Sequence, residues 1–567
     1  MRQSRLYDVI IVGSGAGGGM SAYVLSKAGL KILMLEAGRD YDPEEETPMF
    51  EIPADAPLRA VGTPDRPFGY YDATIDGGWE VPDEPYTVAK GEKFKWWRSR
   101  MLGGRTNHWG RISLRFGPYD FKPFSRDGLG FDWPISYEDV APYYDKTETL
   151  IGVCGSNEGL ENTPDSSPGV LQPPPKPRAY EHLIKRGFDS MDIKAIPVRI
   201  AILTKPLNGR SACFYATDCS RGCSIKANFQ TPTVLLPPAM ETGNLEIVTD
   251  AMVYKIDLAH KDKVRGVTYI DKKTGKHISV EAKVVVLAAS APASSRILLN
   301  SRSELAPQGV ANSSGKVGRY LMDTVGTSIS AHFPALEKLP AHNEDGISRE
   351  HLYVPWWGYQ MQARGELDFP RGYHIEWNGG RLMPEMRVIK PLVEISDTAF
   401  GPELKSDIRR TYGSVLGFSG RGEMIPNDDC YCEIDTQVKD KWGIPVLKFH
   451  WKWSQHETRQ AGHMRKTLHE LVERMGGTVL TGKETDGKKA IKEGGAIIHE
   501  IGSARMGDDP ANSVLNQYCQ AWDQKNLFIM DGASFVSNPD KNPTLTILAL
   551  AWRSSDYLVE QFRKGSL

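Results

Sequence analysis

Residues 7–19 read YDVIIVGSGAGGG, and this stretch decides the fold. The apolar, β-branched run at residues 7–12 is typical of a strand that is buried on both faces. A helical pattern follows at residues 20–28, and residues 31–35 (KILML) predict a second buried strand that leads to Glu36. The sequence therefore predicts a β-α-β unit at this end of the chain, and with it an α/β fold.

Three glycines between the first strand and the helix form a dinucleotide fingerprint. Gly13, Gly15 and Gly18 match GxGxxG. The first permits a tight turn, the second lets a pyrophosphate approach the backbone, and the third lets the helix pack closely on the strand. Glu36, eighteen residues after Gly18, can accept hydrogen bonds from ribose hydroxyls. No second fingerprint was found in the sequence, so the nucleotide is either a nicotinamide co-substrate or a resident flavin.

Composition excludes several other classes of protein. The chain has 567 residues, of which 40% are hydrophobic and 25% charged, so we expect two or more globular domains and no fibrous repeat. A net charge of -2 and a pI of about 6.7 argue against nucleic acid as a partner. No apolar run reaches the ~18 residues of a membrane-spanning helix. The N-terminus shows no signal peptide, so the chain taken alone is expected to be cytoplasmic.

Four more segments carry a family resemblance. They are LGGRTNHW at 102–109, VVVLAASAPASSRILL at 284–299, HEIGSARMG at 499–507 and LFIMDGASFVSNPDKNPTLTIL at 527–548. With the N-terminal fingerprint, they resemble the glucose-methanol-choline (GMC) family of FAD oxidoreductases. The resemblance implies a Rossmann-like FAD-binding domain interrupted by a mostly antiparallel substrate-binding domain. The expected FAD-binding domain comprises residues 1–45, 90–155, 208–325 and 496–567; residues 46–89 form a surface excursion, 156–207 a connecting segment and 326–495 the substrate-binding domain.

The same resemblance implies which residues bind the cofactor. They are Gly13, Gly15, Gly18, Glu36, Gly103, Gly104, Val253, Asp531, Gly532 and Thr544. Asn107 and His108 are expected near the isoalloxazine ring. In some relatives a histidine at this turn is covalently attached to the flavin, and His108 either forms such a link or packs against the ring.

A catalytic pair is expected in the C-terminal motifs. Oxidation of an alcohol by hydride transfer requires a base for the hydroxyl proton, and a neutral imidazole suits this role near pH 7. His499 has the family's His-x-x-Gly-Ser context and is assigned as the base. Asn542 occupies the position where relatives use His or Asn; its amide cannot act as a base, so it should orient the substrate oxygen.

Three cysteines fall within eleven residues: Cys213, Cys219 and Cys223. Their spacing lacks the CxxC pairs and the fourth ligand that zinc favours. It is similar to that in the catalytic subunits of bacterial FAD-dependent glucose and glucoside 3-dehydrogenases, which implies a [3Fe-4S] cluster held by three thiolates. The alternative is a cysteine loop that packs beside the flavin without metal. The other four cysteines are expected to be packing residues.

A cluster beside a flavin favours a dehydrogenase over an oxidase. We therefore expect oxidation of a hydroxyl on a sugar or glycoside, with electrons passing to a protein acceptor. The resemblance implies a small companion subunit, whose export signal would carry this chain to the periplasm, and a cytochrome c acceptor. Three alternatives stay open: an oxygen-using sugar oxidase, a redox-silent lyase of the same family, and a nicotinamide-dependent dehydrogenase.

Overall fold

The computed structural model describes residues 7–63, 66, 69–70, 76–337, 339–340, 342, 344–348, 350–384 and 386–567. Residues 1–6 of the predicted FAD-binding domain lie outside this range. So do residues 64–65, 67–68 and 71–75 of the predicted surface excursion, and residues 338, 341, 343, 349 and 385 of the predicted substrate-binding domain.

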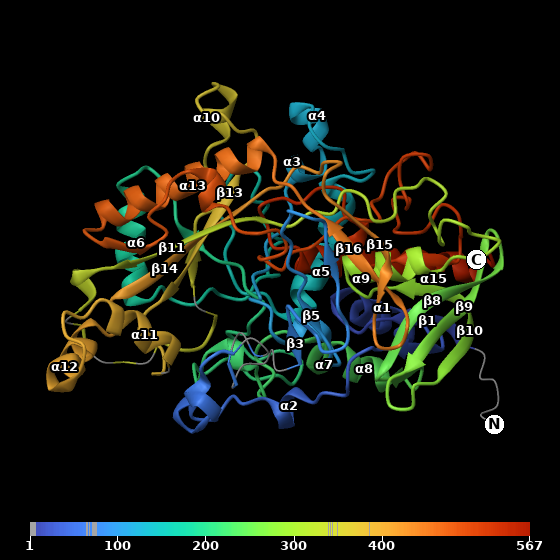
Figure 1. Cartoon of the computed structure of the whole chain (residues 1–567), viewed down its shortest axis with the longest axis horizontal. Coiled ribbons are helices and arrows are strands. Elements are labelled where there is room, and N and C mark those ends of the chain that lie inside the picture. Colours follow the sequence, from blue (N-terminus) through green and yellow to red (C-terminus); the bar gives the residue numbers. More distant parts are fainter. Residues whose placement is uncertain are drawn as a thin grey trace.

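A seven-stranded sheet forms one end of the molecule (Figure 1). Its parallel part contains the predicted β-α-β unit, with the strand order β7-β2-β1-β10 and with β18 also paired to β10. Strands β8 and β9 extend it as an antiparallel meander beyond β10. The bounds are β1 (Tyr7–Val12), β2 (Ile32–Leu35), β7 (Leu245–Val248), β8 (Ala251–His260), β9 (Lys263–Asp271), β10 (His277–Leu287) and β18 (Leu527–Ile529).

The helix after β1 begins earlier than the sequence pattern predicts. Helix α1 (Ala16–Lys27) starts four residues before the expected position at Met20, so Gly17, Gly18 and Gly19 lie inside it. A Cβ at Gly17 would lie 1.7 Å from the carbonyl oxygen of Met530, and one at Gly19 would lie 2.0 Å from the side chain of Thr231. These glycines permit close packing rather than a turn.

Helices from distant parts of the sequence cover this sheet. Helix α15 packs against α1 and α5, and α9 packs against β8. The expected helix at 132–152 begins later, at Tyr137, and the Asp139 carboxylate in its first turn accepts a hydrogen bond from the N–H of Ser136 at 2.8 Å. The helices of this part are α3 (Pro118–Phe121), α4 (Pro123–Asp127), α5 (Tyr137–Ile151), α7 (Thr231–Val234), α8 (Leu236–Met240), α9 (Ala291–Asn300) and α15 (Thr544–Arg563).

A second, antiparallel sheet forms the opposite end (Figure 1). Its order is β13-β14-β11-β17, and helix α13 packs on β11 and β14. The segment expected to be strand-like also holds several helices. The bounds are β11 (Val325–His332), α10 (Tyr359–Ala363), β13 (Tyr373–Gly379), α11 (Met386–Glu394), α12 (Gly401–Thr411), β14 (Val415–Gly422), α13 (Gln455–Arg474), β17 (Thr478–Thr481) and α14 (Gly487–Ala490).

Short elements connect the two sheets, and one hydrophobic core includes side chains of both, for example Val285 and Phe418. Within the described residues, no helix is long and apolar enough to cross a membrane. The division into domains stays a prediction. The remaining elements are α2 (Pro43–Glu46), β3 (Gly77–Gly78), β4 (Thr87–Val88), β5 (Arg98–Ser99), α6 (Ala179–Asp189), β6 (Ile196–Pro197), β12 (Leu352–Tyr353), β15 (Tyr431–Lys439) and β16 (Pro445–His450).

Candidate active site

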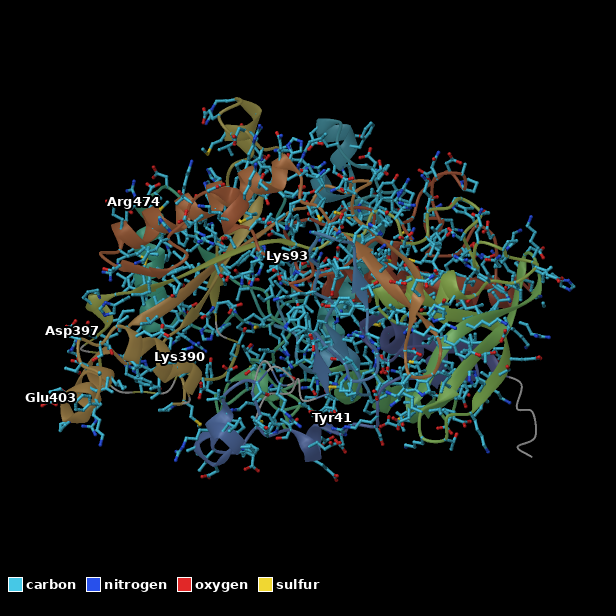
Figure 2. All side chains as sticks on the ribbon, in the orientation of Figure 1. Tyr41, Lys93, Lys390, Asp397, Glu403 and Arg474 are labelled. Carbon is cyan, nitrogen blue, oxygen red and sulfur yellow. The ribbon has the colours of Figure 1, made fainter. Side chains whose placement is uncertain are left out.

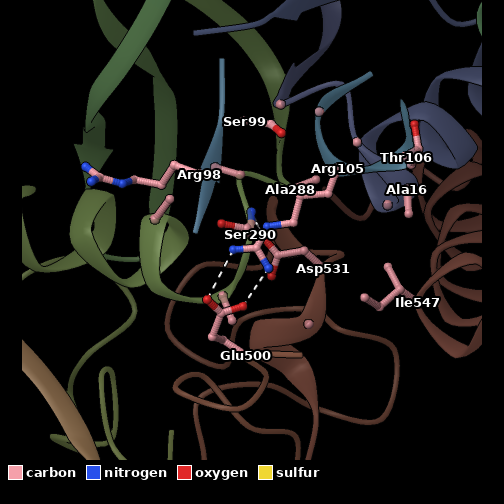
Figure 3. Close-up of a pocket in the computed structure, with 18 of the residues that line it drawn as sticks. Ala16, Arg98, Ser99, Arg105, Thr106, Ala288, Ser290, Glu500, Asp531 and Ile547 are labelled. Carbon is pink, nitrogen blue, oxygen red and sulfur yellow. Dashed lines mark hydrogen bonds and ion pairs between the residues drawn. The ribbon is translucent and has the colours of Figure 1, made fainter. Parts of the chain in front are cut away.

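A cavity of about 360 Å³ lies at the carboxyl ends of the parallel strands, where dinucleotides bind in α/β folds. Its wall is formed by the ends of β1 and β2, the start of α1, strand β5, the segment 288–291 and the start of α15. Figure 3 shows side chains from these separate segments around the cavity. Most of the predicted site residues line it: Gly13, Gly15, Glu36, Gly104, His108, Val253, His499, Asp531, Gly532, Asn542 and Thr544.

The glycine loop has the geometry that the fingerprint predicts. Gly13 has φ +94°, and a Cβ there would lie 2.4 Å from the carbonyl oxygen of Ala288. At Gly15, which precedes α1 and lines the cavity, a Cβ would meet nothing within 4 Å. Gly18 does not line the cavity, because its Cα packs against the loop, where a Cβ would lie 1.9 Å from the oxygen of Gly13. The loop therefore leaves open space on the cavity side only.

Glu36 is fixed by the loop that it faces. Its carboxylate accepts hydrogen bonds from the backbone N–H and the hydroxyl of Ser14, and from the N–H of Gly38 at 2.7 Å. The Ser14 hydroxyl in turn accepts from the N–H of Gly103 at 2.8 Å. Ser14 thus joins the fingerprint loop to the turn at residues 102–109. Sequence reasoning missed this role, because a serine at a variable position of the fingerprint carries no signal.

Three charged side chains, Asp531, Arg105 and Glu500, also line the cavity. Asp531 accepts from the N–H groups of Ser290 and Ala533, and burial raises its pKa to about 6 despite these bonds. Arg105 forms an ion pair with Glu500, with 2.5 Å between Nη1 and Oε2 (Figure 3). Both members of this pair lie inside motifs that the sequence identified, but they are 395 positions apart in the chain.

The turn with the predicted flavin-facing residues is only partly open to the cavity. Gly104 and His108 line it, whereas Gly103 and Asn107 do not. The Asn107 amide donates to the carbonyl of Leu102 at 2.8 Å, so it holds the turn together. His108 Nε2 hydrogen-bonds to the Ser99 hydroxyl. Burial and neighbouring arginines lower the pKa of His108 to about 3, so its imidazole is neutral.

The position and the protonation state of His499 both suit a general base. Its Nδ1 lies 2.9 Å from the Thr324 hydroxyl, and its backbone N–H donates to Asp323 at 3.0 Å. Burial, with Arg421 nearby, lowers the pKa of His499 to about 3. The imidazole is therefore neutral at pH 7. When Nδ1–H donates to Thr324, Nε2 carries the lone pair that can take a substrate proton.

Asn542 reaches the same cavity from the start of α15 and is held by a buried ionic group. Its Nδ2 contacts Glu376 Oε1 at 3.5 Å. Glu376 also contacts His374 at 2.9 Å and Arg421 at 3.4 Å. Burial alone would raise the pKa of Glu376, but these cations lower it to about 2, so the carboxylate only accepts hydrogen bonds. We call Glu376, His374 and Arg421 the Glu376 triad; no sequence motif marked it.

A glycine loop at the ends of parallel strands, with a neutral histidine and an amide beside it, defines a dinucleotide-dependent oxidoreductase. Two family models match the chain, both described as GMC oxidoreductase, over residues 7–326 and 426–551. The chain belongs to the GMC oxidoreductase family, and the resemblance in its motifs is confirmed.

Relatives align over nearly their full length. The chain is 29% identical to a 2-methyl-1,2-propanediol dehydrogenase of Mycolicibacterium austroafricanum, covering 98% of this chain and 95% of the relative. It is 27% identical to the fructose dehydrogenase large subunit of Gluconobacter japonicus, covering 98% of both. It is 28% identical to paromamine 6'-oxidase of Streptomyces fradiae, covering 97% and 91%. The relatives therefore include two named as dehydrogenases and one named as an oxidase.

The family implies FAD, and the cavity fits it. The glycine loop leaves backbone room for a pyrophosphate, α1 offers its N-terminus, and Glu36 is held in place as an acceptor. FAD, when bound, supplies a hydride acceptor. This chain's own part is to bind it and to hold His499 and Asn542 beside it.

The three clustered cysteines are less clearly arranged. None forms a disulfide, and Cys213 and Cys219 pack on one small core cluster. Burial raises the pKa of Cys219 to about 12, so its metal-free form is a thiol. Among the described residues, no group of three or more His, Cys, Asp or Glu side chains is placed to hold a metal ion. The residues as placed do not form a ready ligand set, and the iron–sulfur cluster stays a prediction.

Proposed function

We propose that this protein is an FAD-dependent dehydrogenase that oxidises a hydroxyl group of a sugar or glycoside. One observation carries the proposal: His499 and Asn542 line the same cavity as the dinucleotide loop. The relatives named for fructose, paromamine and a propanediol support a polyhydroxylated substrate.

The residues divide the work of such a reaction. The substrate hydroxyl donates its proton to His499 Nε2, which is free to accept it because the imidazole is neutral. Asn542 Nδ2 has two hydrogens; one points toward Glu376, and the other is left to bind the substrate oxygen. The hydrogen-bonded pair of Arg105 and Glu500 lines the same cavity.

We further propose that electrons leave through a protein acceptor rather than oxygen, and that Cys213, Cys219 and Cys223 hold the [3Fe-4S] cluster that the cysteine spacing predicts. The relative named as a large subunit supports an assembly with companion subunits. Export with such a partner would place the chain in the periplasm. We propose that FAD is bound without a covalent link, because His108 Nε2 is engaged by Ser99.

An oxygen-using sugar oxidase is the second candidate. The paromamine 6'-oxidase relative favours it. Anaerobic addition of glucose, fructose and methyl glucoside tests the core proposal, since a substrate must bleach the flavin absorption. Iron analysis and the yield of hydrogen peroxide per sugar oxidised then separate the two candidates. Acid precipitation that leaves flavin in the pellet would contradict the non-covalent assignment.

A further inference from the structure

Exposed apolar side chains gather beside the cysteine loop. Phe50 is 66% exposed and Phe214 is 57% exposed, yet their rings stack with centroids 6.5 Å apart and an angle of 19° between the planes. Contiguous exposed apolar groups on a soluble protein mark an interaction site. The aromatic patch is centred on the stacked rings of Phe50 and Phe214, and their near neighbours in sequence, Ile52 and Tyr215, are also exposed. Tyr41, labelled in Figure 2, belongs to the same segment of the chain as Phe50.

The two segments of the aromatic patch are tied together, so their surface is defined. The Arg221 side chain donates to the carbonyl of Glu51. The Lys226 ammonium pairs with Glu44 at 2.5 Å. A Cβ at Gly222 would lie 2.8 Å from the Thr47 side chain, which shows how closely the segments approach.

The two segments that form the patch are rich in exposed acidic side chains. Residues 39–61 and 214–226 together carry eight acidic and four basic side chains, whereas the whole chain is nearly neutral. Glu44, Glu45 and Glu46 follow one another in α2, and Glu51 and Asp55 flank the apolar residues; all five are exposed. A surface with an aromatic centre and an acidic rim is complementary to a partner with an apolar centre and a basic rim.

A series of direct contacts connects the cysteine loop beside the patch to the active-site cavity. Ile112 lines the cavity and belongs to the same small core cluster that Cys213 and Cys219 pack against. The buried Arg111 guanidinium donates to the carbonyl of Asn107 at 2.7 Å and to that of Cys219 at 3.4 Å. Direct contacts therefore connect the turn at the cavity to the cysteine loop, which also carries Phe214 of the aromatic patch.

We propose that the aromatic patch is the docking surface for the electron acceptor, and that this acceptor is a small one-electron redox protein with a basic rim around an apolar opening to its prosthetic group. The inference rests on the proposed dehydrogenase function. One substrate alcohol is oxidised to a carbonyl with loss of two electrons and two protons. Two acceptor proteins are each reduced by one electron, and both protons go to solvent.

Cytochrome c, which is basic and has a partly exposed haem edge, serves as the probe with the full-length holoenzyme and its sugar substrate. Cytochrome c reduction should be several-fold faster at ~20 mM salt than at ~200 mM, because exposed charges are screened. Succinylated cytochrome c, in which lysines carry acids instead, should be reduced at least about tenfold more slowly. The variants Phe50→Ser and Glu45→Lys should each slow cytochrome reduction by about 5- to 30-fold, which corresponds to the ~1–2 kcal/mol lost at an interface residue that contributes to binding.

Matched controls come from the far end of the molecule. Phe400 is 83% exposed and Glu403 is on α12, at the lower left of Figure 2. Phe400→Ser and Glu403→Lys should leave cytochrome reduction unchanged. All four variants should reduce a small dye, dichlorophenolindophenol, at the wild-type rate. If neither the wild type nor any variant reduces the dye when sugar is added, the proposed function itself is wrong. If dye reduction is intact but cytochrome c is not reduced, or is reduced equally by patch and control variants, the docking inference is overturned.

Discussion

Replacing Glu376 by Gln should weaken the Glu376 triad, which holds Asn542. The resulting loss of stability should depend on pH, whereas a simple loss of packing would not. The substitution preserves shape and removes one charge. Burial would lower the pKa of His374, but its contact with Glu376 at 2.9 Å and the Asp540 carboxylate 3.8 Å away raise it from 6.5 to about 9. At ~1.4 kcal/mol per pKa unit, this rise corresponds to about 3 kcal/mol of folding free energy.

The sign follows from the direction of the shift. Because the pKa of His374 is raised in the folded state, its contribution is fully present below pH 6.5 and is lost as pH rises through about 9. The lowered pKa of Glu376 reports the same interaction, so the two effects are not added. The difference in stability between wild type and Glu376→Gln should therefore be largest near pH 5.5 and should shrink by pH 9.5.

The size of the effect can be measured by thermal unfolding. At ~2.1 cal/mol/K per residue, a chain of 567 residues has an unfolding entropy of about 1.2 kcal/mol/K. Between pH 5.5 and pH 9.5, the Tm difference between wild type and Glu376→Gln should thus shrink by nearly 3 °C if Glu376 causes the whole pKa shift of His374. It should shrink by about 1 °C if Asp540 causes half of that shift. Glu433→Gln is the matched control, because Glu433 pairs with His450 at 3.0 Å but is half exposed, and such pairs contribute ~0–1 kcal/mol. A Tm difference for Glu376→Gln that is the same at both pH values would refute the reasoning.

Three further predictions concern the cofactor and the catalytic residues. His499→Ala should lower the rate of anaerobic flavin reduction by about 10²- to 10⁴-fold while FAD stays bound, as expected for loss of a general base; wild-type rates would remove His499 from the mechanism. Gly18→Ala should prevent accumulation of folded protein, because its Cβ would lie 1.9 Å from a backbone oxygen, whereas Gly15→Ala should fold and retain less FAD; equal yields and flavin content would contradict the loop geometry. Cys219→Ser should leave flavin reduction intact and slow cytochrome reduction, and an unchanged iron content would argue against its role as a ligand.

The sequence predicted those parts of the structure that depend on local pattern. The β1-α1-β2 unit follows from short apolar runs and glycines, and its order and parallel pairing are confirmed. The start of α1 was wrong by four residues, because glycine is a poor helix former and the pattern gave no reason to include three in succession. Their presence in the helix is explained by close packing on the backbone of Met530 for Gly17, on the loop at Gly13 for Gly18 and on Thr231 for Gly19.

The missing site residues are those whose roles depend on long-range contacts. Arg105 and Glu500 are 395 positions apart, and Asn542 and Glu376 are 166 apart. His374 and Glu376 occupy alternate positions on β13, which places them on one face, but an alternating polar pair also suits an exposed strand face. Helices α11 and α12 were missed for a related reason: the aromatic residues around them suggested strands.

Burial of so many charges beside Asn542 calls for a physical reason, since a buried ion pair is often no more stabilising than apolar packing. Lys541 pairs with both Asp540 at 2.7 Å and Asp120 at 3.0 Å, and Asp540 adjoins His374 in the second sheet. Apolar contacts would tolerate sliding between the C-terminal segment and that sheet, whereas these pairs fit in one register only. We infer that the charges fix the Asn542 amide relative to β13 and β14, so that the candidate site is complete only when both sheets are folded and docked.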